Sequence, residues 1–444
     1  MSNKQLEKNI GFSAAISLVV GMVIGAGVFF KPYAVFGATQ APGLGILAWV
    51  LGAILSIAGG LTAAEVSAAI PKTGGMVAYL RETYGEVWGY LLGWCQSVVY
   101  FPATMAALAV IFGIQVCTIL NIPIDTYKVP VAIGTILFLV VMNCVSSKMG
   151  GILQTVATVC KLIPLVVIII VGFMKGTGGA ANLAPMVTES TNVATGLGAA
   201  LIATLFAYDG WINVGAIAGE MKNPGKDLPK AIVLGLALVA AIYILINIAF
   251  LYVMPASELA ATETPASAVA NIIFGSAGGK VITVGIMISI FGALNGYIMT
   301  GMRIPYSMAV ENKLPFSSFL GKLHPKFNTP VNSAIAMTLL AIAFALSGQF
   351  NMLTDLVIFV IWIFYVMTFF AVFVLRKNRP ELPRPYKVPL YPVVPAIAVI
   401  GGLYVIINTM ISQPLNAGLG LGATLIGLPV YFILKPNFKS VEEN

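Results

Sequence analysis

Long runs of apolar residues alternate with short polar segments along almost the whole chain. An α-helix needs ~20 mostly apolar residues to cross a hydrocarbon core of ~30 Å. Runs of about that length lie at 11–36, 44–70, 86–119, 129–146, 152–174, 196–219, 230–254, 280–308, 331–348, 353–376, 391–411 and 416–434. The pattern predicts an all-α polytopic membrane protein with twelve transmembrane helices.

The polar segments between the runs leave no room for a soluble domain. The longest lie at 175–195, 255–279, 309–330 and 377–390, and each is too short to bury a core of its own. We therefore expect one transmembrane domain over residues 11–434. It is flanked by cytoplasmic tails, at 1–10 and 435–444.

Composition and charge agree with this class and add an orientation. Hydrophobic residues make up 59% of the chain and charged residues 9%, whereas a soluble domain carries about 25% charged residues. With both termini in the cytoplasm, nineteen of the 24 Lys and Arg residues face inward and three face outward, as the positive-inside rule requires. The same bias accounts for the net charge of +8 without a nucleic-acid partner. The expected location is the plasma membrane, as the cell membrane of a bacterium.

Metal and disulfide chemistry have little support. The four cysteines fall within or at the edges of apolar runs, so no extracellular disulfide framework is expected. There is one histidine and no Cys-x-x-Cys pair, which makes a transition-metal site improbable. We expect neither a metal nor a cofactor.

Two of the runs are interrupted where a membrane helix should be most regular. The first contains GMVIGAGVFFKP at 21–32, and the sixth contains LFAYDGWINVGA at 205–216. Interrupted helices in corresponding positions of two halves indicate a transporter binding site. Because the sixth run is five helices after the first, the second half must insert inverted. We expect inverted repeats over about 11–174 and 196–376, with two extra helices over 391–434.

An unwound helix offers groups that suit a zwitterion. Free N–H groups at the start of the second half favour an anion, and free carbonyls at the end of the first half favour a cation. Glycine permits unusual backbone angles and close approach of a ligand. The alternative is that Gly25, Ala26 and Gly27 only allow tight helix packing; the matching interruption in the sixth run favours the binding site.

Six motifs in order resemble those of the amino acid–polyamine–organocation transporters. They are GMVIGAGVF, AEVSAAIPKTGGMVAYLRETYG, LFAYDGWI, GEMKNPGKDLPKAI, LHPKFNTPV and RPYKVPLYPVVP. The combination resembles the L-type amino acid transporter branch, with its bacterial serine/threonine and alanine–serine–cysteine exchangers. The resemblance covers about residues 9–434 and implies a LeuT-like fold with helices 1 and 6 unwound.

The resemblance also implies how a substrate would be held. Its carboxylate should meet the N–H groups of Ala26 and Gly27, and its ammonium the carbonyls of Val23, Phe206 and Asp209. The Phe206 ring should close the site from outside, although alone it would suggest an ordinary lipid-facing or core aromatic. Tyr243 resembles a tyrosine that some relatives use near the site. Many relatives carry serine at position 26, so Ala26 keeps the backbone donor and lacks a hydroxyl.

Four ionisable residues within or near the runs need a separate interpretation. We expect Asp209 to cap the broken end of helix 6 rather than carry a proton, and Glu65 to be structural or gating. Lys31 can extend outward past Pro32 and needs no partner at depth. By resemblance to sodium-independent members, Lys161 takes the place of a bound cation.

The expected partners of Lys161 lie on two other runs. Its ammonium should reach carbonyls near Gly21–Met22 and the Ser289 hydroxyl, and so couple substrate binding to closure of the cytoplasmic path. The alternative is a lysine that only stabilises packing.

Three functions remain open at this point. The favoured one is sodium-independent exchange (antiport) of small neutral L-amino acids (Ser, Thr, Ala, Cys) by alternating access. The second is proton-coupled symport with Asp209, Glu65 or Lys161 titrating. A multispan membrane enzyme is disfavoured because no cluster of His, Asp or Cys is visible near an interface. No disulfide-linked heavy subunit is expected, because the loop LNIPIDTYK lacks cysteine.

Overall fold

The computed structural model describes residues 11–70, 74–188, 192–212 and 221–438, and its regular structure within these ranges is helical. The helices are α1 (Phe12–Val23), α2 (Gly27–Thr39), α3 (Pro42–Ala69), α4 (Met76–Tyr84), α5 (Glu86–Cys95), α6 (Phe101–Leu120), α7 (Ile124–Val145), α8 (Ser147–Cys160), α9 (Leu162–Lys175), α10 (Val193–Ala207), α11 (Pro224–Val253), α12 (Ala256–Leu259), α13 (Pro265–Gly301), α14 (Arg303–Val310), α15 (Ser317–Leu320), α16 (Val331–Ala345), α17 (Phe350–Asn378), α18 (Val393–Ser412), α19 (Pro414–Leu425) and α20 (Gly427–Leu434). A π-helical turn, η1 (Gln96–Tyr100), joins α5 to α6, and 3₁₀ turns occur at η2 (Gly179–Leu183) and η4 (Lys435–Asn437).

The described helices follow the apolar runs closely. Eight are long and apolar enough to cross a membrane, or nine if the bent pair formed by α1 and α2 is one span. Three shorter apolar helices, α9, α10 and α16, fall in the fifth, sixth and ninth runs. The chain is a polytopic helical membrane protein, as the hydrophobic pattern predicts.

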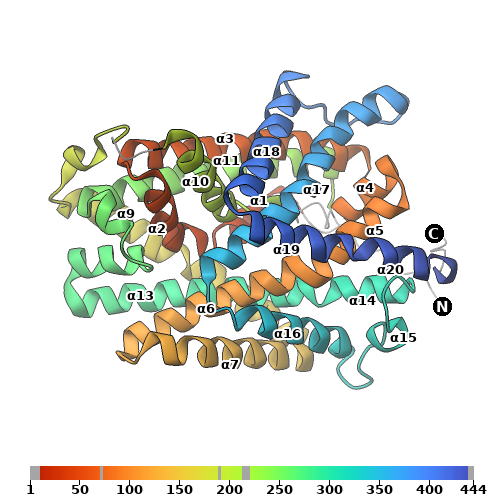
Figure 1. The fold of residues 1–444 in the computed structure, drawn as a ribbon, viewed down its shortest axis with the longest axis horizontal. Helices are drawn as coiled ribbons and strands as arrows, with labels where there is room; N and C mark the ends of the chain where they lie inside the picture. The colour runs from red at the N-terminus through yellow and green to blue at the C-terminus, as the bar shows by residue number, and fades with distance from the viewer. Residues whose placement is uncertain (1–10, 71–73, 189–191, 213–220, 439–444) are drawn as a thin grey trace.

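Several of the long helices run along the longest axis of the molecule. Figure 1 shows α3, α6, α7 and α13 running in that direction, and α6 packs against both α7 and α13. Helices α2 and α9 lie toward one end, whereas α14 and α15 lie toward the other. The broken segment α1–α2 packs against α10 and α11, so the interruption lies inside the bundle.

Burial distinguishes the interior of the bundle from a strongly apolar exterior. Trp49, Tyr208, Tyr243 and Trp362 are almost completely buried in the central core. Large apolar side chains project outward from the peripheral helices, among them Phe138, Ile170, Val281, Ile400 and Ile433. An exterior of this kind faces lipid hydrocarbon, where every backbone polar group must be satisfied inside its own helix.

Some boundaries differ from the sequence expectation. The segment 255–279, expected as a loop, contains α12 and the start of α13, which changes direction at Gly275 where φ is 69°. The fifth run is divided at Lys161, between α8 and α9. Pro164 has no N–H for the carbonyl one turn before it, which weakens the helix at that point. The tail at 1–10 and residues 439–444 of the C-terminal tail lie outside the described residues.

Candidate functional site

The first apolar run is interrupted within the GMVIGAGVFFKP motif. Helix α1 ends at Val23, α2 begins at Gly27, and the two axes differ by 45°. No side chain caps the start of α2. Because the first N–H groups of a helix have no partner within it, this end presents donors with a partial positive charge. The interruption therefore brings the carbonyl end of one helix next to the donor end of another.

The second interruption lies directly against the first. Helix α10 ends at Ala207, and Gly210 follows with φ of 107°, a left-handed conformation that favours glycine. A Cβ atom on Gly27 would lie 2.5 Å from Cα of Ala207, and one on Gly210 would lie 3.0 Å from the Met22 carbonyl oxygen. Residues 213–220, which continue the sixth run, lie outside the described residues.

These contacts show that unusual backbone angles are not the reason for glycine at positions 25 and 27. Gly25 and Gly27 do not adopt left-handed backbone angles. Gly27 is needed because α10 approaches it closely, whereas a Cβ on Gly25 would have its nearest neighbour, Cβ of Ala293, at 3.8 Å. From the sequence, close helix packing and an interrupted helix are alternative explanations for these glycines. In the structure both occur together at this point.

Tyr243 joins the two interruptions. It is fully buried on α11, and its hydroxyl oxygen lies 3.0 Å from the Val23 carbonyl oxygen and 3.2 Å from that of Ala207. A phenol has one hydrogen to donate, so the two carbonyls share it. The rings of Trp49 and Tyr208 lie 5.7 and 5.1 Å from the Tyr243 ring. Tyr243 therefore lies between the two interruptions and bonds to the same carbonyl that is expected to meet the substrate ammonium.

Asp209 is held by two tyrosines that the sequence analysis did not identify. Its carboxylate accepts a hydrogen bond of 2.6 Å from the Tyr100 hydroxyl and another of 2.6 Å from the Tyr365 hydroxyl. Tyr100 belongs to η1 and Tyr365 to α17, so Asp209 connects the end of α10 to two other runs. Bonds from hydroxyls to an ionised carboxylate are short and strong. The helix half that Asp209 was expected to cap falls mostly within 213–220, so capping stays a prediction.

Phe206 lies one residue before the end of α10 and is 9% exposed. Its ring is 5.8 Å from the ring of Phe350 in an edge-to-face arrangement. The ammonium of Lys31 lies 5.3 Å from the centroid of each ring.

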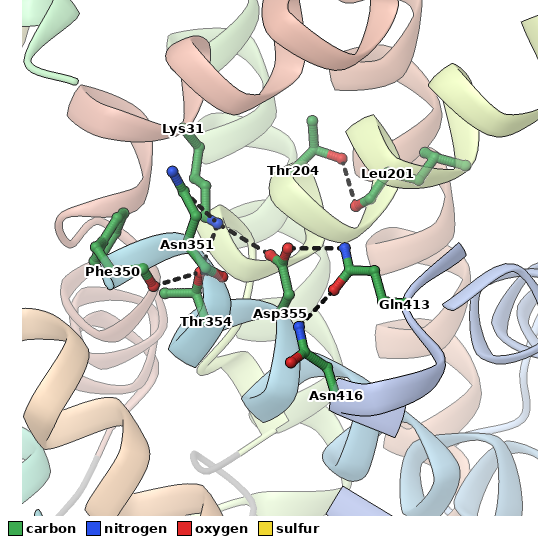
Figure 2. A network of polar contacts seen from close by, with 9 residues as sticks. All are labelled: Lys31, Leu201, Thr204, Phe350, Asn351, Thr354, Asp355, Gln413 and Asn416. Atoms are coloured by element: carbon green, nitrogen blue, oxygen red, sulfur yellow. Dashed lines mark hydrogen bonds and ion pairs between the residues drawn. The ribbon is translucent and has the colours of Figure 1, made fainter. Parts of the chain in front are cut away.

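The expectation that Lys31 extends to solvent without a partner is wrong. Its side chain is fully buried, and its ammonium donates to Asn351, Thr354 and Asp355 (Figure 2). The sequence misses this because the acceptors lie more than 300 positions away, at the start of α17.

Lys161 is the second buried lysine of the site. It is 2% exposed, and its ammonium donates to the carbonyl oxygen of Gly21 on α1, one of the contacts expected from the sequence. The other expected partner, the Ser289 hydroxyl, is fully buried and has no hydrogen-bond partner among the described residues. The role of Lys161 in coupling stays a prediction.

A cavity of about 180 Å³ adjoins the end of α1 on the side of α13. Gly21 and Met22 line it beside the interruption, and Tyr297, Thr300 and Arg303 add polar groups. A larger cavity of about 390 Å³ is lined only by apolar side chains, such as Phe112 and Phe291. The smaller cavity is the better candidate for a substrate path, because it reaches the interruption and carries polar groups.

Glu65 is the centre of an ion-pair cluster at the end of α17. Its carboxylate accepts two hydrogen bonds from Arg376, of 2.8 and 2.7 Å, and one of 2.7 Å from the N–H of Val388. Burial raises the pKa of the nearby Tyr386 phenol to about 12, and the negative charge of Glu65 adds to the effect. Glu65 therefore fastens α3 to α17 and the segment that follows it.

Within the described ranges, no three or more His, Cys, Asp or Glu side chains are grouped so as to hold a metal ion. The four cysteines are free thiols.

Comparison with known proteins places this geometry in a family. The family model described as amino acid permease matches residues 10–434. The chain belongs to the amino acid permease family. This membership identifies a transmembrane amino acid transporter of the amino acid–polyamine–organocation superfamily and excludes the membrane enzyme.

Individual relatives align over nearly the whole chain. The serine/threonine exchanger SteT of Bacillus subtilis (strain 168) is 44% identical over 97% of this chain and 97% of its own. The b(0,+)-type amino acid transporter 1 of Mus musculus is 32% identical over 93% of this chain and 85% of its own. The Asc-type amino acid transporter 1 of Mus musculus is 31% identical over 96% of this chain and 81% of its own.

The sequence analysis missed Tyr100, Tyr365 and Asp355 as neighbours of the site. Each is a polar side chain in or beside an otherwise apolar run, and such residues mark functional positions in membrane helices. That signal was available, but only the fold could tell which of these residues meet.

Proposed function

We propose that this protein is a sodium-independent exchanger of small neutral L-amino acids, with Ser, Thr, Ala and Cys as substrates. One observation carries the proposal: the two interruptions, α1–α2 and the end of α10, lie against each other inside the bundle. Their sequences belong to a chain 44% identical to a serine/threonine exchanger over almost its full length. An exchanger built this way works by alternating access to a single site between two halves.

The proposed topology has twelve spans with both termini in the cytoplasm. The bent pair, the eight long apolar helices and the three shorter ones supply these spans. Residues 11–174 and 196–376 form two inverted repeats, with 391–434 as extra helices and with tails at 1–10 and 435–444. Helices 1 and 6 are unwound at the site. In this orientation α2 points outward, and α14 and α15 lie at the cytoplasmic end.

The substrate binds at the interruption through its backbone groups. The carboxylate meets the N–H groups of Ala26 and Gly27, where Gly25 leaves room for close approach. The ammonium meets the carbonyls of Val23, Phe206 and Asp209. Tyr243 already donates toward the Val23 carbonyl, which keeps a second lone pair for the ammonium.

Two residues couple binding to access. Phe206 closes the site on the outer side. Lys161 provides a fixed positive charge at the Gly21 carbonyl, where a sodium-coupled transporter would hold an ion, and we propose that it reaches Ser289 in another state of the cycle. Coupling then requires no sodium.

The alternative of proton-coupled symport keeps one specific observation in its favour. The Asp209 carboxylate is buried, and two tyrosine hydroxyls hold it beside the site. A group in that position could carry a proton if its hydrogen bonds change during the cycle. Either mechanism uses the same fold in the cell membrane, and neither requires a disulfide-linked heavy subunit.

Purified protein in liposomes separates the two mechanisms. Exchange predicts that labelled serine enters vesicles that contain unlabelled serine or alanine and stays out of empty vesicles, with or without sodium. Uptake into empty vesicles driven by an acid exterior would instead establish symport. Competition by a panel of amino acids defines the substrates, and strong inhibition by large cationic amino acids would contradict the proposed preference.

A further inference from the structure

Lys31 is a charged residue that the substrate-binding scheme does not use. It lies one helical turn after Gly27 on α2, and its side chain is fully buried. A buried ammonium is costly unless it is paired and hydrogen-bonded, so its surroundings must compensate the charge.

Hydrogen-bond acceptors from a single helix satisfy all the donors of the Lys31 ammonium. The Lys31 ammonium donates 3.1 Å to Asn351 Oδ1, 2.6 Å to Thr354 Oγ1 and 3.3 Å to Asp355 Oδ1. An ammonium has three hydrogens, and these three acceptors use all of them. All three acceptors belong to the first turns of α17 (Figure 2).

A second layer of contacts extends the network beyond α17. The other oxygen of Asp355 accepts a 3.1 Å hydrogen bond from Gln413, at the junction of α18 and α19. The Gln413 side-chain oxygen in turn accepts a 2.9 Å bond from Asn416 on α19. Figure 2 shows Lys31, Asp355, Gln413 and Asn416 linked one to the next. Asp355 is thereby held in place for Lys31.

The network also lies beside the ring expected to close the site. The Lys31 ammonium is 5.3 Å from the centroids of Phe206 and Phe350, within the range of cation–π attraction. Helix α10, which carries Phe206, packs against both α2 and α17. The charge, the aromatic pair and three helices therefore meet at one point.

We propose that Lys31 is a positioning residue for transport: its ammonium locks α2 to α17 and so holds Phe206 closed over the outer side of the binding site. This inference rests on the proposed function and its orientation. Opening the outer path would move α2 away from α17, which breaks the contact with Asp355 and admits water to both charges. The ion pair thus sets the balance between closed and open outer states.

Substitutions that remove the attraction test this role, and a double variant does so without leaving an orphaned charge. Lys31→Gln and Asp355→Asn each neutralise one partner, and the double variant neutralises both. The matched control is Lys128→Gln, because Lys128 and Asp125 form a 3.6 Å ion pair within α7 alone, with Asp125 fully exposed. A membrane-impermeant thiol reagent added outside reports access to Ala26→Cys, since Ala26 is 1% exposed at the interruption. The same variants with Ala26 retained measure the background labelling of the native cysteines. They are also the proteins in which exchange kinetics are measured.

The double variant should be labelled at least about fivefold faster than the Ala26→Cys parent, the lower end of usual coupling between sites. Its apparent KM for external serine should fall, because a larger fraction of the protein is open to the outside, and its maximal exchange rate should fall with it. The Lys128→Gln control should match the parent in every assay.

Two results would overturn the inference. One is unchanged labelling and unchanged kinetics in the double variant. The other is a pattern in which each single variant loses both melting temperature and exchange rate, while the double variant regains both completely. That pattern would make the ion pair merely structural. Failure of the wild type to exchange in liposomes would instead reject the proposed function, and the labelling contrast would still report on the ion pair.

Discussion

Gly25 and Gly27 stand two positions apart in one motif, yet their surroundings differ. Gly27 faces the backbone of Ala207 on the neighbouring helix, whereas a Cβ on Gly25 would make only ordinary contacts, the nearest with Cβ of Ala293 at 3.8 Å. A motif of small residues is compatible with tight packing or with a ligand site; here Gly27 allows tight packing, and the proposed ligand site uses the room at Gly25. The same contrast applies to the lysines of the first and fifth runs, which are both buried but bind different kinds of acceptor.

Alanine substitutions at the two glycines should therefore have different effects on melting temperature and on exchange. In Gly27→Ala the new Cβ would lie 2.5 Å from Cα of Ala207, so α2 must shift away from α10. Overpacking of this kind costs about 1–3 kcal/mol. We expect a lower melting temperature and a large loss of exchange. Gly25→Ala has no contact closer than 3.8 Å and should keep the parent melting temperature. Equal melting temperatures for the two variants in the same detergent would contradict this packing argument.

The first apolar run consists of two shorter helices, α1 and α2, which different elements hold in place. Helix α1 is held at its end by Lys161 from the junction of α8 and α9, and by Tyr243 from α11. Helix α2 is held by α17 through Lys31. The two halves of the first run are thus attached to different parts of the bundle, which is what independent movement of the halves requires.

Lys161→Ala should uncouple α1 from the α8–α9 junction. A hydrogen bond to a charged group contributes about 1.5–3 kcal/mol, so its loss should lower the exchange rate about tenfold or more. Added sodium should not restore the rate, because the site has lost a donor rather than an ion. The exposed Lys280→Ala is the control, and it should exchange as the parent does. Normal exchange by Lys161→Ala, or a sodium requirement of the wild type, would reject the role of this lysine.

The distribution of polar side chains over the molecule gives it two ends and an apolar belt. In the proposed orientation, the cluster around Glu65 and the helices α14 and α15 lie at the cytoplasmic end, and the network of Lys31 lies on the side of α2. The cavity beside Met22 adjoins α13 and Arg303, whereas Phe206 and Lys31, which lie on α10 and α2, do not line it. In the proposed orientation, this arrangement corresponds to a state closed to the outside.

The orientation can be measured directly. Lys175 and Lys322 are both exposed, at opposite ends of the predicted topology. In intact cells an impermeant thiol reagent should label Lys175→Cys and not Lys322→Cys, and after permeabilisation it should label both. The reverse pattern would invert the proposed topology and, with it, the outer position of the Lys31 network.

The order and extent of the apolar runs were enough to determine the class of protein and most helix boundaries. This is because a membrane helix must satisfy its own backbone and cover itself with apolar side chains, and both requirements are local. For the same reason, the break before Gly27 and the turn at Gly210 could be read from single motifs.

Which polar groups meet across the bundle could be decided only by the tertiary structure. The hydroxyls of Tyr100 and Tyr365 reach Asp209 from runs more than 100 positions away on either side, and Asp355 reaches Lys31 from 324 positions away. Nothing local to Lys31 distinguishes a side chain extended to solvent from one turned inward. A buried charge is tolerated only where several distant segments place acceptors around it, so its partners follow from the packing of whole helices rather than from its neighbours in the chain.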